Sequence, residues 1–336
     1  EAWEVLRATS PITHVHSGLP PFLLIHGDAD PTVPFEQSPL FQARMQAAGN
    51  VCDLIRVTGG VHGMTPWAKL GSDYQQQMIA WLKTTFETGR KLSPAERRAQ
   101  VQAGLRHASA EVRQVAVHSL AHSDLADGLV EETIAALADS DAEVREWAAT
   151  VLGPRGKLAE SAVPKLIAQL QGDKVKQCRE TAARALGRIG KATPDDRRAI
   201  PVLEQASAQD PDSVTRVVAL GALALITPSD TARIAAVSKY LTHDDALTRM
   251  KAAHALGYLG DRSSAAAPAI ARALQMATDP HERGYLSRSL GQIGDRAQLP
   301  VLLEEYGKER DERALGEMRG AIKRLGGMVP AANAKP

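Results

Sequence analysis

The sequence predicts a multidomain protein in which part of an α/β domain with parallel strands precedes an all-α solenoid of repeated helix pairs. Three observations lead to this fold class. All four Phe and three of the four Trp lie before residue 90. Two short apolar runs in that first region have the length and the Pro and Gly boundaries of buried parallel strands. Beyond it, an Arg followed seven residues later by a Leu returns about every 34 residues, a period typical of helical repeats.

The charge balance and the cysteine count exclude several classes of protein. Forty Lys and Arg accompany 39 Asp and Glu, so the formal net charge is +1, which argues against a nucleic-acid partner held by a large cationic surface. No apolar run reaches the ~18 residues that a membrane-spanning helix needs. The two cysteines, Cys52 and Cys178, lie far apart and form no C-x-x-C pair. We therefore expect neither a disulfide framework nor a metal site built on them, and no cofactor.

The first region reads as strand, acidic loop, helix, strand, histidine loop and helix. The strand at 21–27 leads into a polar turn, and a helix is expected over 36–48. A second strand over 51–57 leads into a glycine-rich loop around His62, and a last helix follows over about 72–86. Adjacent parallel strands carry their following loops at the same edge of a sheet. The order is that of the acid and base arms of a Ser–His–acid triad, in which the carboxylate orients the imidazole.

Several strings in this region resemble a known family. SPITHV (10–15), PPFLLIHGDAD (20–30), Val33-Pro34 and Gln37-Ser38 resemble the C-terminal part of α/β-hydrolase esterases of the acetylesterase and feruloyl-esterase type. They are more distantly similar to prolyl-oligopeptidase-type peptidases. The resemblance covers residues 1–88. It implies that Asp30, the last Asp of the H-G-x-x-D string, is the triad acid, that His62 is the triad base, and that Asp28 is a turn residue.

Each assignment has a structural alternative. Asp30 could be a plain Asx-turn residue and His62 an ordinary loop histidine. His26 is interpreted as structural, because it closes the first strand beside the acidic loop. Trp67 is a candidate for lining the substrate pocket, with a packing role as the alternative. His14-Val15-His16 lacks a third ligand at metal-site spacing, so no metal is predicted, and Cys52 is expected to be a small buried apolar residue.

The nucleophile expected of this family does not occur in the sequence. No G-x-S-x-G string is found in the 336 residues. Because the chain order in the fold is Ser, acid, His, we expect the Ser and the oxyanion-hole amides upstream of Glu1. The chain is interpreted as a fragment that is inactive alone, from an active parent hydrolase. The compartment stays undecided.

Three functions remain open. The first is a serine ester hydrolase for small acyl or aryl esters, such as those that decorate plant polysaccharides, with a solenoid that binds a protein partner. The second is a serine peptidase of the prolyl-oligopeptidase type. The third is a non-catalytic scaffold that carries a relic of a hydrolase.

The repeat region begins after a short linker. We expect the hydrolase segment over 1–88, a linker over 89–94, the solenoid over 95–326 and a disordered tail over 327–336. Ser93-Pro94-Ala95-Glu96 fits a capping box at the start of the first helix. Each unit should contain two helices. One begins near a Pro, and the other carries the Arg and the Leu, as listed here: Pro164, Pro201, Pro268, Pro300; Arg113, Arg145, Arg179, Arg216, Arg249, Arg283; Leu120, Leu152, Leu186, Leu223, Leu256, Leu290.

This pattern looks like HEAT repeats of the short kind found in phycocyanobilin lyases, with six units and a degenerate seventh around 313–326. Gly187, Gly257 and Gly291 follow the Leu and are expected to end their helices. An Asp four residues before several of the Arg is expected to cap its helix and pair with that Arg. The Arg residues that recur in the repeats are here called the Arg ladder. A structural role for them is favoured over the alternative, in which they form a surface for an anionic ligand. The partner of the solenoid is expected to be a protein of unknown identity.

Overall fold

A computed structural model describes residues 10–88, 93–121 and 123–330. The chain divides into two compact units, Glu1–Val151 and Leu152–Pro336. The predicted linker at 89–94 and the predicted tail at 327–336 lie largely outside the described residues. Among those residues, no helix combines the length and the apolar character that crossing a membrane requires.

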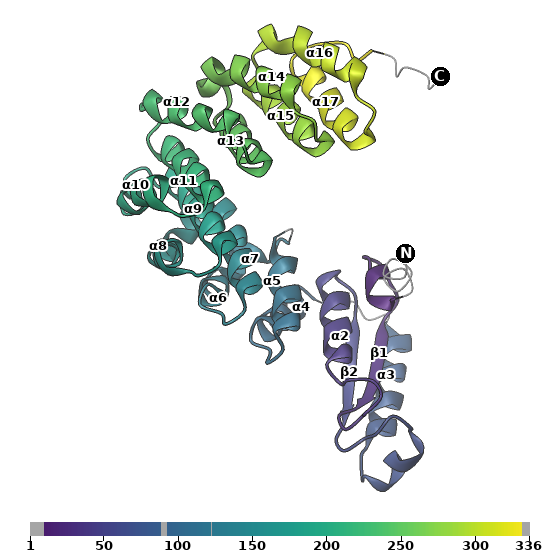
Figure 1. The fold of residues 1–336 in the computed structure, drawn as a ribbon. Helices are drawn as coiled ribbons and strands as arrows, with labels where there is room; N and C mark the ends of the chain where they lie inside the picture. The colour runs from purple at the N-terminus through teal and green to yellow at the C-terminus, as the bar shows by residue number, and fades with distance from the viewer. Residues whose placement is uncertain (1–9, 89–92, 122, 331–336) are drawn as a thin grey trace. The chain divides into compact units, whose positions relative to one another are not determined.

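The first unit opens with a small parallel sheet. Its elements are η1 (Pro11–His14), β1 (Phe22–Gly27), α2 (Gln37–Ala47), β2 (Cys52–Val57), η2 (Thr65–Lys69) and α3 (Tyr74–Thr88). β1 and β2 pair in parallel from Phe22 opposite Cys52 to Gly27 opposite Val57 (Figure 1). The expected alternation of strands and helices is therefore confirmed within a residue or two at each end.

The two faces of this sheet are covered by different helices, because successive strand residues point to opposite faces. Ile55 and Val57 form a small buried cluster with Trp67 and Tyr74, and Met78 of α3 packs against it. On the other face, Leu54 lies beside side chains of α2. Trp81 of α3 donates to Asp53 Oδ2 at 2.6 Å, which ties α3 to β2. Cys52 is fully buried, as expected, and burial raises its pKa to about 12.

The remainder of the first unit begins the helix repeats. Its elements are α4 (Pro94–Leu105), α5 (Ala110–Leu120), η3 (Ala126–Leu129), α6 (Val130–Ala136) and α7 (Ala142–Leu152), the last ending at the boundary between the units. The capping box predicted at Ser93 is present: Glu96 N–H donates to the Ser93 hydroxyl at 3.2 Å, and Ser93 N–H donates to the Glu96 carboxylate at 2.8 Å.

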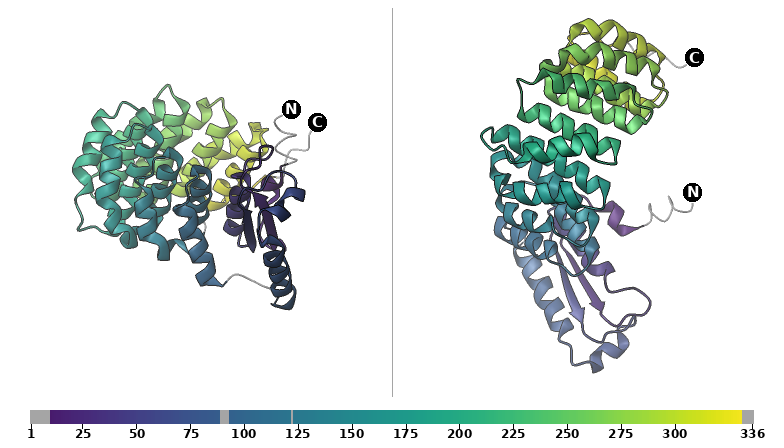
Figure 2. Two further views of the ribbon diagram at one scale, coloured as in Figure 1. Left: turned by 90° about the horizontal axis from the view of Figure 1, so that it is seen from below. Right: turned by 60° about the vertical axis from the view of Figure 1, so that its left-hand side comes forward.

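The second unit is built from helix pairs stacked in chain order (Figure 2). Its elements are η4 (Gly153–Ala162), α8 (Val163–Gly172), α9 (Lys176–Ala192), α10 (Ala199–Gln209), α11 (Ser213–Ile226), α12 (Thr231–Lys239), η5 (Tyr240–Thr242), α13 (Ala246–Leu259), η6 (Gly260–Ala266), α14 (Ala267–Met276), α15 (Pro280–Ile293), η7 (Arg296–Gln298), α16 (Leu299–Lys308) and α17 (Glu312–Arg324). Helices α9, α11, α13, α15 and α17 each pack on the next. The Leu that recurs in each repeat is at most 2% exposed, so it lies in the core.

The three glycines expected to end helices do not do so. Gly187, Gly257 and Gly291 lie inside α9, α13 and α15, which continue for several more residues in α9 and for two in the others. A methyl group at Gly291 would meet the Cα of Ala321 at 2.7 Å. These residues lack a side chain because a neighbouring helix approaches that closely, and not because the helix stops.

Candidate functional site

The loops that follow β1 and β2 meet through their backbones. Asp28 N–H donates to Val57 O at 3.1 Å, and Ala29 N–H donates to Gly60 O at 3.0 Å. A methyl group at Gly27 would lie 2.1 Å from Gly60 O. Only glycine therefore fits at this crossing, and the crossing sets the acidic loop directly against the histidine loop.

Asp30 is held in one orientation by its own loop. Its Oδ1 accepts hydrogen bonds from the backbone N–H groups of Thr32 at 2.8 Å and Val33 at 3.0 Å. The side chain is only 4% exposed. Burial alone would raise its pKa, but the N–H groups of Val33 and Thr32 and the adjacent His62 outweigh burial and lower the pKa to about 2. Asp30 is therefore a fixed anion at neutral pH.

The second oxygen of Asp30 faces the imidazole of His62. His62 Nδ1 lies 2.9 Å from Asp30 Oδ2, and the His62 side chain is 57% exposed. A neutral imidazole that donates its Nδ1 proton to a carboxylate carries its lone pair on Nε2. The pair thus combines a buried, oriented carboxylate with an accessible base, which is the arrangement needed to accept a proton from a nucleophile.

Two neighbouring residues support this loop. His26 Nδ1 lies 2.8 Å from the Ser38 hydroxyl, and its Nε2 lies 3.4 Å from Asp30 Oδ2, so His26 contacts the acidic loop as expected. Asp28 accepts from Gly59 N–H at 2.6 Å and from Arg56 Nε at 2.8 Å. The Gly59 bond, followed by the Arg56 bond, lowers the pKa of Asp28. Asp28 therefore fixes the turn while Asp30 faces the imidazole.

Trp67 lies beneath the histidine loop. Its side chain is 4% exposed, its indole N–H donates to Val61 O at 2.8 Å, and its ring packs edge-on against Tyr74. This hydrogen bond from the indole fixes the backbone of Val61, the residue before His62. Its assignment to a substrate pocket stays a prediction.

The described residues contain no group of three or more His, Cys, Asp or Glu placed to hold a metal ion.

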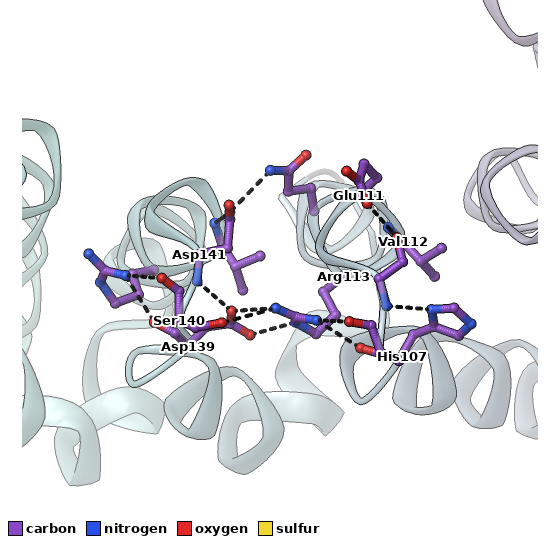
Figure 3. Close-up of polar contacts among 12 residues, drawn as sticks. His107, Glu111, Val112, Arg113, Asp139, Ser140 and Asp141 are labelled. Atoms are coloured by element: carbon purple, nitrogen blue, oxygen red, sulfur yellow. Dashed lines mark hydrogen bonds and ion pairs between the residues drawn. The ribbon is translucent and has the colours of Figure 1, made fainter. Parts of the chain in front are cut away.

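The Arg ladder of the repeats is engaged within the solenoid (Figure 3). Arg113 forms a two-pronged ion pair with Asp139 at 2.7 and 2.8 Å and also donates to the carbonyls of His107 and Ala108. Both side chains are nearly buried, at 13% and 11% exposed. The same pattern pairs the Arg of later repeats with an acid of the following one: Arg179 with Asp210, Arg249 with Glu282 and Arg283 with Glu309. A structural role therefore accounts for these guanidinium groups.

The pairing differs from the expected one in its partner. Asp212, Asp245 and Asp279 cap their helices, as predicted. The carboxylates that pair with Arg come instead from the next repeat. Glu282, the partner of Arg249, lies three residues after its capping Asp279. For the other pairs the missed signal is a second acid two residues before the capping Asp, as in Asp139 before Asp141 and Asp210 before Asp212. This acid also accepts the N–H of the capping residue.

Comparisons with known proteins match two separate parts of the chain to different families, and residues 46–97 lie between the two matches. The family profile described as HEAT repeats matches residues 98–187, 130–224, 200–285 and 234–322, together more than half of the chain. A profile described as BD-FAE matches residues 1–45. Esterase LipQ of Mycobacterium tuberculosis is 49% identical over 45 residues, which are 13% of this chain and 11% of the esterase. The chain thus spans about a ninth of that relative.

The solved structures that the chain matches are distant from it in sequence. The complex of CpcE and CpcF of phycocyanin lyase from Nostoc sp. PCC7120 is 21% identical, with a TM-score of 0.44 over 71% of this chain and 97% of that chain. An engineered protein is 20% identical, with a TM-score of 0.34 over 70% of this chain and 99% of that one.

Proposed function

The chain belongs to the HEAT-repeat family, and from this premise we propose that its repeats bind a protein partner while its first 88 residues supply the acid and base of a serine ester hydrolase. HEAT solenoids stack helix pairs into extended surfaces that suit protein partners. The esterase assignment concerns the short segment that precedes them.

One observation carries the hydrolase proposal: the 2.9 Å contact between His62 Nδ1 and Asp30 Oδ2, formed by loops that follow two adjacent parallel strands. A buried carboxylate with a pKa near 2 stays ionised and holds the imidazole in the tautomer whose Nε2 accepts a proton. The similarity of residues 1–45 to the BD-FAE profile, and of a 45-residue stretch to Esterase LipQ, supports an ester as the substrate.

The proposed reaction is acyl transfer from an ester, with a serine supplied from outside residues 1–336. The serine oxygen attacks the ester carbonyl carbon as His62 Nε2 takes its proton. The C–O bond to the alcohol breaks, and His62 returns the proton to the leaving alcohol. Water then releases the acid by the same two steps. Small acyl or aryl esters, such as those on plant polysaccharides, are the proposed substrates.

The test is an esterase assay on the natural protein that contains this sequence, with p-nitrophenyl acetate as substrate and a fluorophosphonate to label the serine. Asp30→Asn and His62→Gln should each lower kcat by about 10³-fold or more, because either change removes the oriented base. His16→Gln and Asp124→Asn are matched controls, since both residues are exposed and lie outside the pair. Residues 1–336 alone should show no turnover.

Two results would change the assignment. Hydrolysis that survives both substitutions would remove Asp30 and His62 from the mechanism. A natural protein that neither turns over ester nor labels with the fluorophosphonate would favour the second candidate, a HEAT scaffold. That candidate is supported by the match of the repeats over most of the chain. Cleavage of peptide but not ester substrates would favour the peptidase alternative.

A further inference from the structure

Helix α11 presents a face of small and apolar residues between two helices that carry long cationic side chains. Its Gly221 packs so closely on α13 that a methyl group there would lie 2.7 Å from the Cβ of Ala255. On its other side, a methyl group at Gly187 of α9 would lie 2.7 Å from the Cβ of Ala222. The close packing of three helices leaves a shallow pocket, here called the basic pocket. It is lined chiefly by Arg184, Arg188, Val218, Leu225, Lys251 and Tyr258.

Cations outnumber carboxylates around this pocket. Lys251 of α13 reaches across α11 to Glu180 of α9, with 2.6 Å between Nζ and Oε1. The same oxygen of Glu180 pairs with Arg184 one helical turn later. Glu180 is 9% exposed and is therefore enclosed by the two cations that share it. One carboxylate thus serves two positive side chains, and Arg188 adds a third.

Arg188 contacts an aromatic ring. Its guanidinium carbon lies 5.2 Å from the centroid of the Tyr258 ring, and Lys191 Nζ lies 5.5 Å from the same centroid. Tyr258 is 41% exposed. Within the described residues no carboxylate pairs with Arg188. Its planar guanidinium is thus held by stacking, with donors available for a carboxylate that comes from outside.

The partly buried imidazole of His254 lines the same pocket, and the charges around it shift its pKa. Burial, together with the positive charges of Arg184, Lys251, Arg188 and Arg288, lowers its pKa to about 4. The electrostatic potential at the site is thus positive. An arriving carboxylate would meet a net positive potential.

We propose that the basic pocket binds an acidic segment of a partner protein, which places an apolar side chain on Val218 and Leu225 of α11 and carboxylates on Arg184, Arg188 and Lys251. Charge complementarity selects the carboxylates, and the apolar face of α11 selects a side chain between them. This inference refines the partner-binding role proposed above for the repeats. It requires no hydrolase activity.

A polypeptide fits this surface better than a nucleic acid. Glu180 lies among the cations, and Glu317 pairs with Arg288 on the next helices. Both carboxylates would repel a continuous run of phosphates. A phosphate backbone binds along an extended cationic track, whereas these cations gather around one apolar patch.

The test measures fluorescence anisotropy of a labelled peptide of about twelve residues in which Glu and Leu alternate. The chain should bind this peptide, and added salt should weaken binding. Arg188→Glu should weaken it by about tenfold to hundredfold, the range for a lost charge-assisted hydrogen bond. Arg197→Glu is the matched control, because it makes the same change in net charge at an exposed arginine outside the pocket. Circular dichroism should show both variants folded.

Two altered peptides test whether both the carboxylates and the apolar side chains are needed for binding. A peptide with Gln in place of Leu and one with Lys in place of Glu should each bind at least tenfold more weakly than the Glu/Leu peptide. The inference is overturned if the Glu/Leu peptide does not bind, if Arg197→Glu weakens it as much as Arg188→Glu, or if a single-stranded oligonucleotide of equal charge binds as tightly. None of these results bears on the esterase assay, so the two proposals fail separately.

Discussion

Arg216 is the rung of the Arg ladder at which the acidic partner is replaced. It donates to the carbonyls of Asp210 and Pro211, as its counterparts do in their repeats. Two residues before the capping Asp245, where other repeats place Asp139 or Asp210, stands His243. The ring nitrogen of His243 accepts the N–H of Asp245 at 3.0 Å, as the acids do. His243 therefore accepts the backbone N–H of the capping residue, as the acid does in other repeats, but it supplies no carboxylate for Arg216.

We predict that His243→Asp stabilises the second unit by about 1 kcal/mol, because it restores a partly buried ion pair with Arg216 while the N–H of Asp245 keeps its acceptor. Urea denaturation followed by circular dichroism measures the change. His281→Asp, at an exposed histidine, is the control. An equal gain from the control would show a general charge effect, and no gain in either would show that the new carboxylate does not reach Arg216.

His254 should make the second unit sensitive to mild acid. Its pKa is lowered from 6.5 to about 4 in the folded state, so the unfolded chain takes up the proton first as the pH falls. The stability that this group confers is present above about pH 6.5 and is lost as the pH falls toward 4. Between about pH 7 and about pH 5 the loss is roughly 2 kcal/mol. His254→Gln should reduce this loss and His281→Gln should not, as measured by urea midpoints at each pH.

At the scale of elements, the glycines of the inner helices divide into two kinds. Gly291 in α15 leaves no room for a methyl group beside Ala321, whereas nothing lies within 4 Å of the corresponding point at Gly316 in α17. We predict that Gly291→Ala destabilises the fold by about 1 to 3 kcal/mol through overpacking. Gly316→Ala should stabilise it by about 0.5 to 1 kcal/mol, because alanine favours an open helix position. Thermal unfolding of the two variants compares them, and a shift in the same direction would contradict this explanation.

The same glycines show where sequence reasoning stops. Glycine after an apolar helix is typical of a helix end, and no local signal distinguishes Gly291 from such a residue. The reason for its presence is Ala321, which is thirty positions away in the sequence. By contrast, the periodic Leu and the Pro-marked helix starts could be predicted, because they depend on residues within one or two helical turns.

At the candidate site, the sequence could predict that Asp30 and His62 lie close together. It could not predict the contacts that hold their loops in place. Asp30 and His62 follow two apolar runs, and parallel pairing of those runs is enough to bring them together. The Gly27–Gly60 crossing and the indole bond beneath the loop depend on tertiary packing. The basic pocket was not predictable, because it joins three helices that belong to different repeats.

At the scale of the whole molecule, the two kinds of architecture should differ in resistance to protease. Large apolar side chains are exposed on α3 and in its neighbouring loop, including Phe86 at 83%, Met64 at 55% and Ile79 at 48%. The helices from α11 to α17 bury most of theirs in one core, although Met276 at the end of α14 is 81% exposed. We predict that limited proteolysis removes residues 1–88 first and leaves a protected product spanning about 95–326. Mass spectrometry identifies the products, and early cleavage within the repeats that spares 1–88 would contradict this prediction.

The Arg ladder also has a mechanical consequence. Each two-pronged pair, such as Arg249 with Glu282, fastens one repeat to the next near the ends of its helices. In such a stack of repeats, the ion pairs resist the separation of neighbouring repeats under force. Among the residues that the structure describes, Arg216 donates to backbone carbonyls and pairs with no carboxylate at the joint with α13. Among the described joints of the second unit, the one between α11 and α13 has the Lys251–Glu180 contact in place of a two-pronged pair, so we expect it to yield before the others when this unit is stretched.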